Sequence, residues 1–418
     1  MDLQNVVITG VGPVSAIGSG REAFWSALRS GQPGFGPITL CDTEGLESTI
    51  AAEVKGFDLT TYLPEARASV RRMPRMVQLT LAAAALALED SGLDLDGCGR
   101  DRVGVHVGTS IANIATSFEM RDALLEYHRI SAHSAFFGFN HSAACLTSAT
   151  FDLRGPLHTT SSGCNSGLDA LGDAAQDIRL GEAEAMLVIG SDCEVVQEIV
   201  MALARSGSLA TRYNDRPAIA SRPFDTERDG NVIGEGAGAL LLESESHARQ
   251  RGARVYARLA AYRSAAAGSH REYSHDDPDL DVAPCVRAMG GAVGAAGWRP
   301  EQVDLVNANG SASKLYDRLE AQALGELFGA RLPELPLHSI KSMLGQHGAG
   351  SSALQAISAC LAIAEGEVPP TINHDALDPA CGPLQVVTRL RAMPIERCLV
   401  HAIGMGGFYY SAAAFERG

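Results

Sequence analysis

One local pattern recurs along the chain: a short apolar segment that ends near a glycine, followed by a helix-forming stretch. Residues 6–13, 102–108 and 185–191 are rich in Val and other β-prone residues and predict buried strands. Residues 76–91 and 167–180 have the spacing of apolar residues that is typical of helices. Buried strands that alternate with helices predict a layered α/β fold.

A second set of strands begins near residue 254 and continues at residues 303–307 and 398–402. Its order of elements resembles that of the first half, although no sequence repeat aligns the two. We therefore predict two α/β halves, residues 1–253 and 254–418, with internal duplication as a structural hypothesis. Residues 265–280 are rich in Ser, His and Asp and predict an inserted loop.

Composition excludes several classes of protein. The 418 residues are 46% hydrophobic, enough for two cores, yet no apolar run reaches the roughly 18 residues of a membrane span. The net charge of −15 argues against a nucleic-acid partner. The nine cysteines form no C-x-x-C pair or zinc-like spacing, so no metal site is expected. With no signal-like N-terminal segment, a cytoplasmic location is expected.

Cys164 stands where a polar, β-prone run ends at Gly163 and an amphipathic helical pattern begins. A thiol at a helix N-terminus feels the positive end of the helix dipole and unpaired backbone N–H groups, which favour a thiolate and an adjacent oxyanion. This arrangement predicts a nucleophile elbow. The alternative is a small thiol that merely packs at a strand-to-helix junction, because free cysteines are often buried.

Three arginines, Arg71, Arg72 and Arg75, lie together just before a helical pattern. They form a basic cluster in an acidic chain and are candidates for docking an acidic partner. The alternative is that they are simply solvent-exposed charges at the start of the helix.

Motifs from one end of the chain to the other resemble the β-ketoacyl synthase (ketosynthase) family of the thiolase superfamily, especially elongating enzymes and catalytic subunits of aromatic polyketide systems. Besides residues 6–12 and the Cys164 segment, they are Arg71-Arg-Met, Gly108-Thr-Ser, Ser221-Arg-Pro-Phe-Asp-Thr-Glu-Arg-Asp-Gly230, Gly234-Glu-Gly-Ala-Gly238, Lys341-Ser-Met-Leu-Gly345, Pro369-Pro-Thr-Ile-Asn373 and Gly404-Met-Gly-Gly407. Thiolases proper fit worse, because nothing resembles their second catalytic cysteine.

The resemblance implies a thiolase-like fold of two similar α/β halves in an α-β-α-β-α arrangement, with no cofactor. It implies an acyl carrier protein bearing a phosphopantetheine thioester as partner, with the Arg71, Arg72 and Arg75 cluster as its docking site. It also implies a homodimer, with a heterodimer of related subunits as the alternative.

In that family the cysteine accepts an acyl chain, and two histidines bind a malonyl thioester as it decarboxylates. The segment that matches the first histidine motif, H-G-T-G-T, begins with Asn309. In the second motif, K-S-x-x-G-H, Gln346 follows Lys341-Ser-Met-Leu-Gly345, and His347 comes one place later. The separation of Lys341 from Pro369 needs no insertion, so we place Gln346 at the histidine position. A helical backbone would turn His347 about 100° away; a bulge that returns it to the pocket is the alternative.

The resemblance assigns roles to four further positions. Lys341, Asp317 and Glu320 match charged residues behind the catalytic groups, where a Lys–Glu pair would hold the loop of Asn309. Ile403 matches a gating Phe whose backbone N–H, with that of Cys164, resembles an oxyanion hole. A smaller gate indicates a wider or differently shaped substrate, and simple repacking of the pocket explains it equally well.

Both histidine positions thus change while the nucleophile is kept. Asn309 and Gln346 can donate hydrogen bonds, but neither carries a proton near neutral pH. We therefore predict a ketosynthase-like acyltransferase or cyclase that loads Cys164 and releases the chain without decarboxylation. Aldol, Claisen or lactone closure in specialised-metabolite (antibiotic or other polyketide) biosynthesis is expected, with Lys341 or His347 as the nearest proton carrier.

Three alternatives remain open from the sequence. The first is a decarboxylative synthase of a polyketide or fatty acid pathway that uses His347 and Asn309 in altered geometry. The second is a non-elongating partner subunit, although such subunits typically lose the cysteine. The third is a carrier-binding scaffold, which only the arginine cluster supports.

Overall fold

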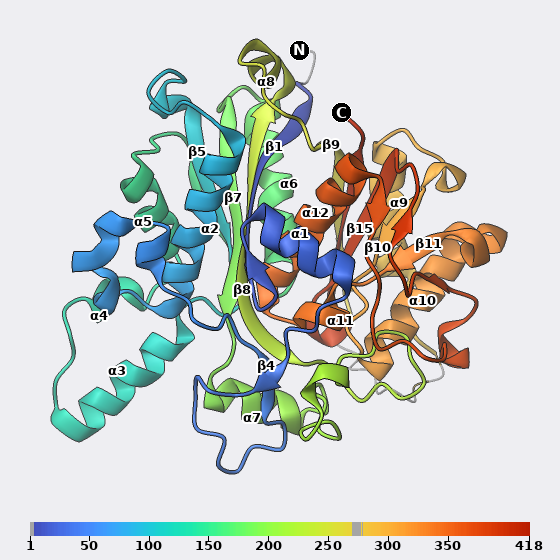
Figure 1. The fold of residues 1–418 in the computed structure, drawn as a ribbon, viewed down its shortest axis with the longest axis horizontal. Helices are drawn as coiled ribbons and strands as arrows, with labels where there is room; N and C mark the ends of the chain where they lie inside the picture. The colour runs from blue at the N-terminus through green and yellow to red at the C-terminus, as the bar shows by residue number, and fades with distance from the viewer. Residues whose placement is uncertain (1–3, 270–276, 278) are drawn as a thin grey trace.

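The computed structural model describes residues 4–269, 277 and 279–418. Figure 1 shows five layers from left to right: outer helices, a sheet, two central helices, a second sheet and a further set of outer helices. This is the predicted thiolase-like α-β-α-β-α arrangement. The N-terminal half supplies the left-hand sheet and the C-terminal half the right-hand one.

The N-terminal sheet has the strand order β6-β5-β7-β8-β1. Its strands are β1 (Val6–Ser15), β5 (Val103–Gly108), β6 (Leu157–Thr160), β7 (Ala185–Cys193) and β8 (Ile233–Ser244). The pairs β5–β6 and β5–β7 are parallel, whereas β7–β8 and β8–β1 are antiparallel. The parallel strands bring the ends of β5, β6 and β7 to one edge of the sheet, where the chemistry-bearing residues gather.

The C-terminal sheet has the order β13-β11-β10-β15-β16-β9. Its strands are β9 (Ala257–Ala266), β10 (Leu305–Asn307), β11 (Pro336–His338), β13 (Gln385–Val386), β15 (Arg397–Ile403) and β16 (Tyr409–Glu416). A short antiparallel contact between β9 and β1, Val7 with Arg258 and Ile8 with Ala257, joins the two sheets. The strands of the two halves are therefore joined by continuous pairing around the central helices.

The helices pack in three layers. The outer helices of the N-terminal half are α2 (Arg75–Ser91) and α5 (Ser142–Phe151), and those of the C-terminal half are α9 (Ala283–Ala295) and α10 (Lys314–Phe328). Between the sheets lie α6 (Ser166–Arg179) and α12 (Gly348–Glu365). Residues 348–363 of α12 are all buried, as expected of a helix that has a sheet on either side.

Close contact between the two central helices depends on small residues. A side chain on Gly167 in α6 would place its Cβ 2.3 Å from the backbone oxygen of Ala349 in α12. Glycine is therefore required here, because the backbones themselves are in contact. The same approach brings the N-terminal end of α12 beside the Cys164 turn.

The remaining elements are short or peripheral. They are β2 (Gly18–Ser19), α1 (Arg21–Ser30), β3 (Gly36–Pro37), β4 (Ile50–Ala52), α3 (Ile114–Tyr127), α4 (Ser134–Phe137), α7 (Gln197–Arg205), α8 (Glu245–Gln250), α11 (Lys341–Leu344), β12 (Glu367–Val368) and β14 (Arg391–Ala392). The loop predicted at residues 265–280 begins as the last residues of β9, and residues 270–276 and 278 of it lie outside the described residues.

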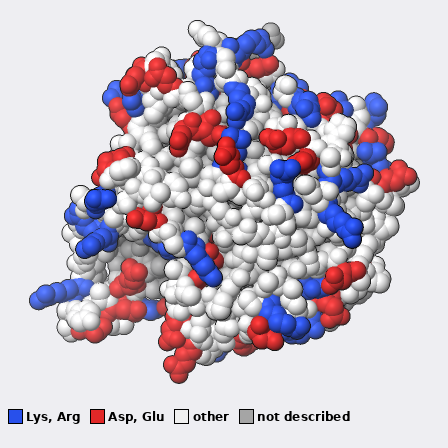
Figure 2. All heavy atoms as spheres, in the orientation of Figure 1, with Lys and Arg blue, Asp and Glu red and all other residues white. Residues whose placement is uncertain are grey.

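Two surface properties bear on function. Within the described ranges, no helix is both long and apolar enough to cross a membrane. On the face in Figure 2, basic and acidic side chains alternate around the rim and leave the centre largely uncharged. This face offers no broad basic surface for a polyanion, in keeping with the net charge of −15.

Candidate active site

Cys164 lies in a tight turn between β6 and α6. Gly163 has a φ of 75°, in the left-handed region that glycine tolerates, and α6 begins at Ser166. The Ser166 hydroxyl accepts a hydrogen bond from the backbone N–H of Ser162 (2.8 Å) and donates to the Gly163 oxygen at 2.6 Å. The structure thus has the sharp strand-to-helix turn expected of a nucleophile elbow.

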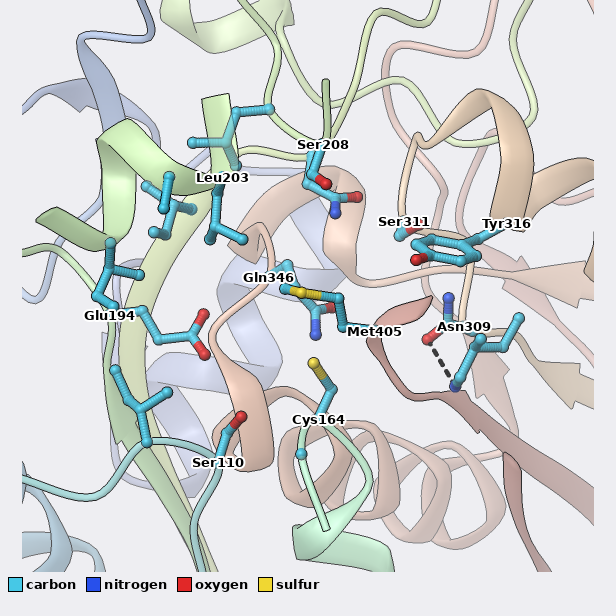
Figure 3. Close-up of a pocket in the computed structure, with 18 residues that line it drawn as sticks. Ser110, Cys164, Glu194, Leu203, Ser208, Asn309, Ser311, Tyr316, Gln346 and Met405 are labelled. Carbon is cyan, nitrogen blue, oxygen red and sulfur yellow. Dashed lines mark hydrogen bonds between the residues drawn. The ribbon is translucent and has the colours of Figure 1, made fainter. Parts of the chain in front are cut away.

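The thiol of Cys164 faces a cavity of about 290 Å³, at the lower end of the range for small-molecule sites. Its lining includes the apolar side chains of Ile111, Ile199 and Leu203 and polar groups from both halves of the chain. None of the eighteen residues drawn in Figure 3 is a histidine. Among the described residues, the wall of this cavity therefore holds no imidazole.

Burial raises the pKa of the Cys164 thiol to about 12, and a negative charge on the Glu194 carboxyl would act in the same direction. The Lys341 ammonium and a hydrogen bond from Gln346 lower this pKa, but by less. The helix N-terminus was expected to favour a thiolate. The neutral thiol is instead the stable form before substrate binds, because desolvation outweighs the stabilising contacts.

Gln346 lines the cavity, and its amide nitrogen faces the Cys164 sulfur in Figure 3. Its backbone N–H donates to the Val232 oxygen at 2.8 Å, which anchors the loop to the strand region before β8. Its Oε1 atom is buried without a hydrogen-bond partner among the described residues. The side-chain amide nitrogen therefore hydrogen-bonds the Cys164 sulfur, and the amide oxygen is open to a donor on a bound acyl group.

His347 lies outside the cavity, so its assignment to the catalytic group and to proton transfer is corrected. Its ring packs against backbone, 2.9 Å from the position that a Cβ on Gly236 would take. The reason is not a helical turn, since residues 346 and 347 lie between α11 and α12. Burial lowers the pKa of His347 to about 3, with a further contribution from the Lys341 charge, so the ring stays neutral near pH 7.

Asn309 enters the cavity from the loop after β10 and is held by Lys341. The Lys341 Nζ atom donates to the Asn309 backbone oxygen (2.8 Å) and to its side-chain Oδ1 (2.7 Å). Burial lowers the pKa of Lys341 to about 8, so the ammonium form prevails at neutral pH. These bonds fix which way the amide points, because Oδ1 must face the ammonium and Nδ2 must face away from it.

Ile403 also lines the cavity, and its backbone N–H is already engaged. It donates to the Asn309 Oδ1 atom at 3.2 Å, the contact drawn as a dashed line in Figure 3. The N–H assigned to an oxyanion hole is thus directed at a side chain of the protein. A substrate oxygen must compete with Asn309 for it.

Glu320 and Asp317 hold the loop of Asn309 through its backbone. Glu320 accepts from the N–H groups of Asn309 (2.7 Å) and Gly310 (2.8 Å), and Asp317 accepts from that of Ser311 (2.9 Å). The expected hydrogen bond between Lys341 and Glu320 is not the contact found: the side chain of Lys341 donates its hydrogen bonds to Asn309 instead. Both carboxylates nevertheless position the loop.

Two titratable residues of the cavity were missed from the sequence, Glu194 and Tyr316. Glu194 follows β7, and Tyr316 lies in the first turn of α10 with its hydroxyl accepting from the Gly406 N–H at 2.7 Å. A signal for Glu194 exists in the sequence: Asp192 and Glu194 alternate at the end of a buried strand, which places both on one face. No comparable pattern marks Tyr316.

The arginine cluster is divided by the structure. Arg71 and Arg72 are exposed, whereas the Arg75 guanidinium binds the buried carboxylate of Glu235, with Nε 2.6 Å from Oε2. Arg75 also donates to the Val54 oxygen at 2.9 Å. Arg75 therefore pairs with a buried carboxylate while 30% of its side chain stays exposed, and Glu235 would otherwise be a buried charge without a cation.

Replacing Arg75 by alanine is expected to lower the free energy of unfolding by about 2 to 3 kcal/mol, since it strands a buried carboxylate while one third of the arginine is solvent-exposed. Arg71→Ala with Arg72→Ala, the matched control, should leave stability within about 0.5 kcal/mol. Denaturant titration measures both. An Arg75→Ala protein as stable as this control would contradict the internal role.

Among the described residues, no group of three or more His, Cys, Asp or Glu side chains is arranged to hold a metal ion.

Comparison with known proteins bears on the whole chain. The family model "Beta-ketoacyl synthase, N-terminal domain" matches residues 3–248, and "Beta-ketoacyl synthase, C-terminal domain" matches residues 256–375. The 3-oxoacyl-[acyl-carrier-protein] synthase 2 of Synechocystis sp. is 32% identical over 97% of each chain. The tetracenomycin polyketide synthase ketoacyl synthase alpha subunit of Streptomyces glaucescens is 34% identical over 99% of this chain and 97% of its own.

Solved structures of ketosynthases are similar to this chain over its whole length. A type II polyketide acyl-carrier protein in complex with its ketosynthase bound to the hexaketide contains a chain with a TM-score of 0.90 and 29% identity, covering 100% of both chains. The ishigamide ketosynthase/chain length factor has a TM-score of 0.89 at 30% identity, again over 100% of both. A β-ketoacyl synthase from Burkholderia phymatum STM815 reaches 0.89 at 31% identity over 99% of this chain and 100% of its own.

Proposed function

The chain belongs to the β-ketoacyl synthase family and is an acyltransferase, and we propose that it loads an acyl chain on Cys164 and discharges it without decarboxylating malonate. The observation that carries the proposal is the cavity wall: the nucleophile faces the amides of Gln346 and Asn309 and no imidazole. We infer that these amides stand where the family's two histidines stand.

Loading begins with a thioester of an acyl carrier protein. The Cys164 sulfur attacks the thioester carbonyl, the carrier thiol leaves, and an acyl-Cys164 thioester remains. The oxyanion that forms would displace Asn309 Oδ1 from the Ile403 N–H and accept that bond together with the one from the Cys164 N–H. Lys341 keeps hold of Asn309 meanwhile, so the amide that orients the acyl group is not lost.

Discharge then requires a nucleophile, and we propose that the acyl chain supplies it. An enol or hydroxyl within the bound chain attacks the acyl carbonyl, because effective molarities of an intramolecular group can reach about 10⁵ M. Attack by the enol carbon closes a ring by Claisen chemistry, and attack by the hydroxyl gives a lactone; in both cases the carbon–sulfur bond breaks and the Cys164 thiol leaves. An aldol closure within the chain releases nothing, so it would precede one of these two release steps. Such closure fits a specialised-metabolite pathway, including antibiotic polyketides.

The test of this function uses linear acyl thioesters of a carrier protein or of N-acetylcysteamine. Intact-protein mass should show an adduct on Cys164, and mass spectrometry of the released material should show a product lighter than the corresponding acid by one water. Release of only the hydrolysed acid, or of a longer chain, from an enzyme that is demonstrably acylated would rule out cyclisation.

Decarboxylative condensation is the alternative, and the comparisons support it better than they support cyclisation, because the chain is similar over its full length to condensing enzymes. In that case Gln346 and Asn309 would hold the malonyl thioester carbonyl by hydrogen bonds alone. The carrier partner would be the same, and Arg71 and Arg72 remain the proposed docking residues in both cases.

We also propose a homodimer. An exposed apolar segment runs from the C-terminal end of α3 to the residues just after α4, and α3 projects from the body of the molecule in Figure 1. Its large exposed side chains are Leu124, Leu125, Tyr127, Ile130, Phe136 and Phe139. Clustered apolar side chains on a surface mark an interaction site, and a second copy of this chain is the occupant that the family implies, with a related subunit as the alternative.

Light scattering of the purified protein is expected to give about twice the 43.9 kDa chain mass at micromolar concentration. Leu125→Glu, in the most exposed of these side chains at 72%, should shift the equilibrium toward monomer because it places a charge in an apolar contact. A wild-type monomer at this concentration would contradict the dimer.

A further inference from the structure

We propose that Glu194 is the proton-transfer residue of this site: its neutral carboxyl group protonates the Cys164 sulfur as the acyl chain leaves and accepts the proton of the attacking group. The proposal rests on the proposed function, in which a nucleophile of the substrate discharges acyl-Cys164. Glu194 would supply the proton transfer that the amides of Gln346 and Asn309 cannot perform.

The cavity needs a proton carrier, and few groups qualify. Of the described residues that line it, only Cys164, Glu194 and Tyr316 titrate. Cys164 is the leaving group, and burial raises the pKa of Tyr316 above its ordinary value, away from neutral pH. Figure 3 shows the Glu194 carboxyl group pointing into the cavity from the side opposite Tyr316.

A carboxyl group in this cavity could be ionised or neutral, and its neighbour decides which. Asp192, two residues earlier, accepts from the Thr109 hydroxyl (2.8 Å) and from the backbone N–H groups of Ser110 (2.8 Å), Ile111 (3.1 Å) and Ala349 (2.7 Å). Four donors around one carboxylate stabilise its charge. Burial raises the pKa of Asp192 to about 6 and these donors oppose that rise, so Asp192 is the member of the pair that is ionised at pH 7.

Glu194 has a much poorer environment for a charge. Its carboxyl group accepts one hydrogen bond, from the backbone N–H of Gly348. Burial and the Asp192 charge raise the pKa of Glu194 well above the ordinary value. A Cβ on Gly348 would lie 2.2 Å from Asp192 Oδ2 and 2.8 Å from Glu194 Oε1, so the two carboxyl oxygens are near neighbours. Two adjacent buried carboxyl groups whose surroundings differ in this way divide into one carboxylate and one acid.

The backbone at Gly348 leaves room for both carboxyl groups, Asp192 and Glu194. Gly348 has a φ of 51°, and any side chain there would overlap both carboxyl groups. The glycine lets the first turn of the eighteen-residue helix α12 reach the pair with the N–H groups of Gly348 and Ala349. The positive end of the helix stabilises the single negative charge on Asp192.

The chemical step balances without a cofactor. As the substrate enol or hydroxyl bonds to the acyl carbon, its proton passes to one oxygen of Glu194, and the carbon–sulfur bond breaks. The other oxygen gives its proton to the departing Cys164 sulfur, which regenerates the thiol favoured by its high pKa. Glu194 ends as it began, as a neutral acid, and nothing is oxidised or reduced.

Glu194→Gln keeps the shape and the hydrogen-bonding capacity of the side chain but cannot transfer a proton. Acyl-Cys164 should therefore accumulate in this variant, and its discharge should be about 10²- to 10⁴-fold slower than in wild type. Single-turnover mass spectrometry follows both. Glu198→Gln, the same change at an exposed position of α7, is the matched control and should discharge at the wild-type rate. Discharge by Glu194→Gln within threefold of wild type would overturn the proposal.

A second measurement decides on the protonation state without turnover. The infrared difference spectrum of wild type minus Glu194→Gln at neutral pH should contain the C=O band of a neutral carboxylic acid, and wild type minus Glu198→Gln should not. A carboxylate band in the first spectrum would overturn the proposal, even if Glu194→Gln were too unstable for kinetics.

The two proposals fail separately. If wild type forms acyl-Cys164 but only hydrolyses it, cyclisation is wrong, and Glu194 is still judged by the hydrolysis rate of Glu194→Gln, because water requires the same two proton transfers. If Cys164 is never acylated, the proposed function is wrong, and the infrared spectrum alone decides whether Glu194 is a neutral acid.

Discussion

Replacing Cys164 by alanine is expected to abolish covalent acyl loading and to reduce turnover by more than about 10³-fold, because no other nucleophile is assigned in the cavity. The fold should survive. The sulfur faces the cavity rather than the close-packed core, so its removal should change the free energy of unfolding by about 1 kcal/mol or less.

Intact-protein mass after incubation with an acyl thioester measures the loading. Cys145→Ala is the control, since Cys145 is a half-buried thiol in α5, away from the cavity wall. This variant should load as wild type does. An adduct of the same mass on Cys164→Ala would place the nucleophile elsewhere.

The layered fold could be predicted because periodicity and glycine placement are local properties of the sequence. The strand at residues 102–108 and the helix at residues 76–91 are found as β5 and α2, with ends that differ by one residue. The turn at Gly163 was equally readable, since only a sharp break lets a helix begin just after a strand. Layer order came from the family resemblance rather than from these patterns.

The state of each site residue could not be read in the same way, because it depends on what tertiary packing places around it. The helix N-terminus next to Cys164 predicts a thiolate, but the walls of the cavity desolvate the sulfur and raise its pKa to about 12. Arg75 seemed to be part of a surface cluster only because its partner Glu235 lies 160 residues away in sequence.

The motif correctly predicted which of residues 346 and 347 lines the cavity, but the helical turn given as the reason was wrong. Gln346 was expected at the cavity and lines it. His347 was expected to turn away on a helix, yet its backbone is not helical, with φ −145° and ψ 64° just before α12. The imidazole is buried because Gly236 and Gly350 leave room for it, and the contribution of Gly236 comes from a strand distant in sequence.

Malonyl carrier protein is expected to lose carbon dioxide 10²- to 10⁴-fold more slowly with this enzyme than with a condensing enzyme that has two active-site histidines, since positioned electrophilic or acid–base groups contribute rates of about that size. Gln346 and Asn309 can hold the thioester carbonyl, but as neutral amides they stabilise the enolate less than imidazole groups that can approach protonation.

Carbon-14 label in the malonyl carboxylate measures the release directly. The double variant Asn309→His, Gln346→His should release labelled carbon dioxide faster than wild type, because Lys341 and Glu320 already hold the loop in which the first imidazole would stand. Gln346→Asn, which keeps an amide, is the matched control and should not accelerate release. Wild-type release at the rate of an ordinary condensing enzyme would mean that the amides suffice, and decarboxylative condensation would then replace cyclisation as the function of acyl-Cys164.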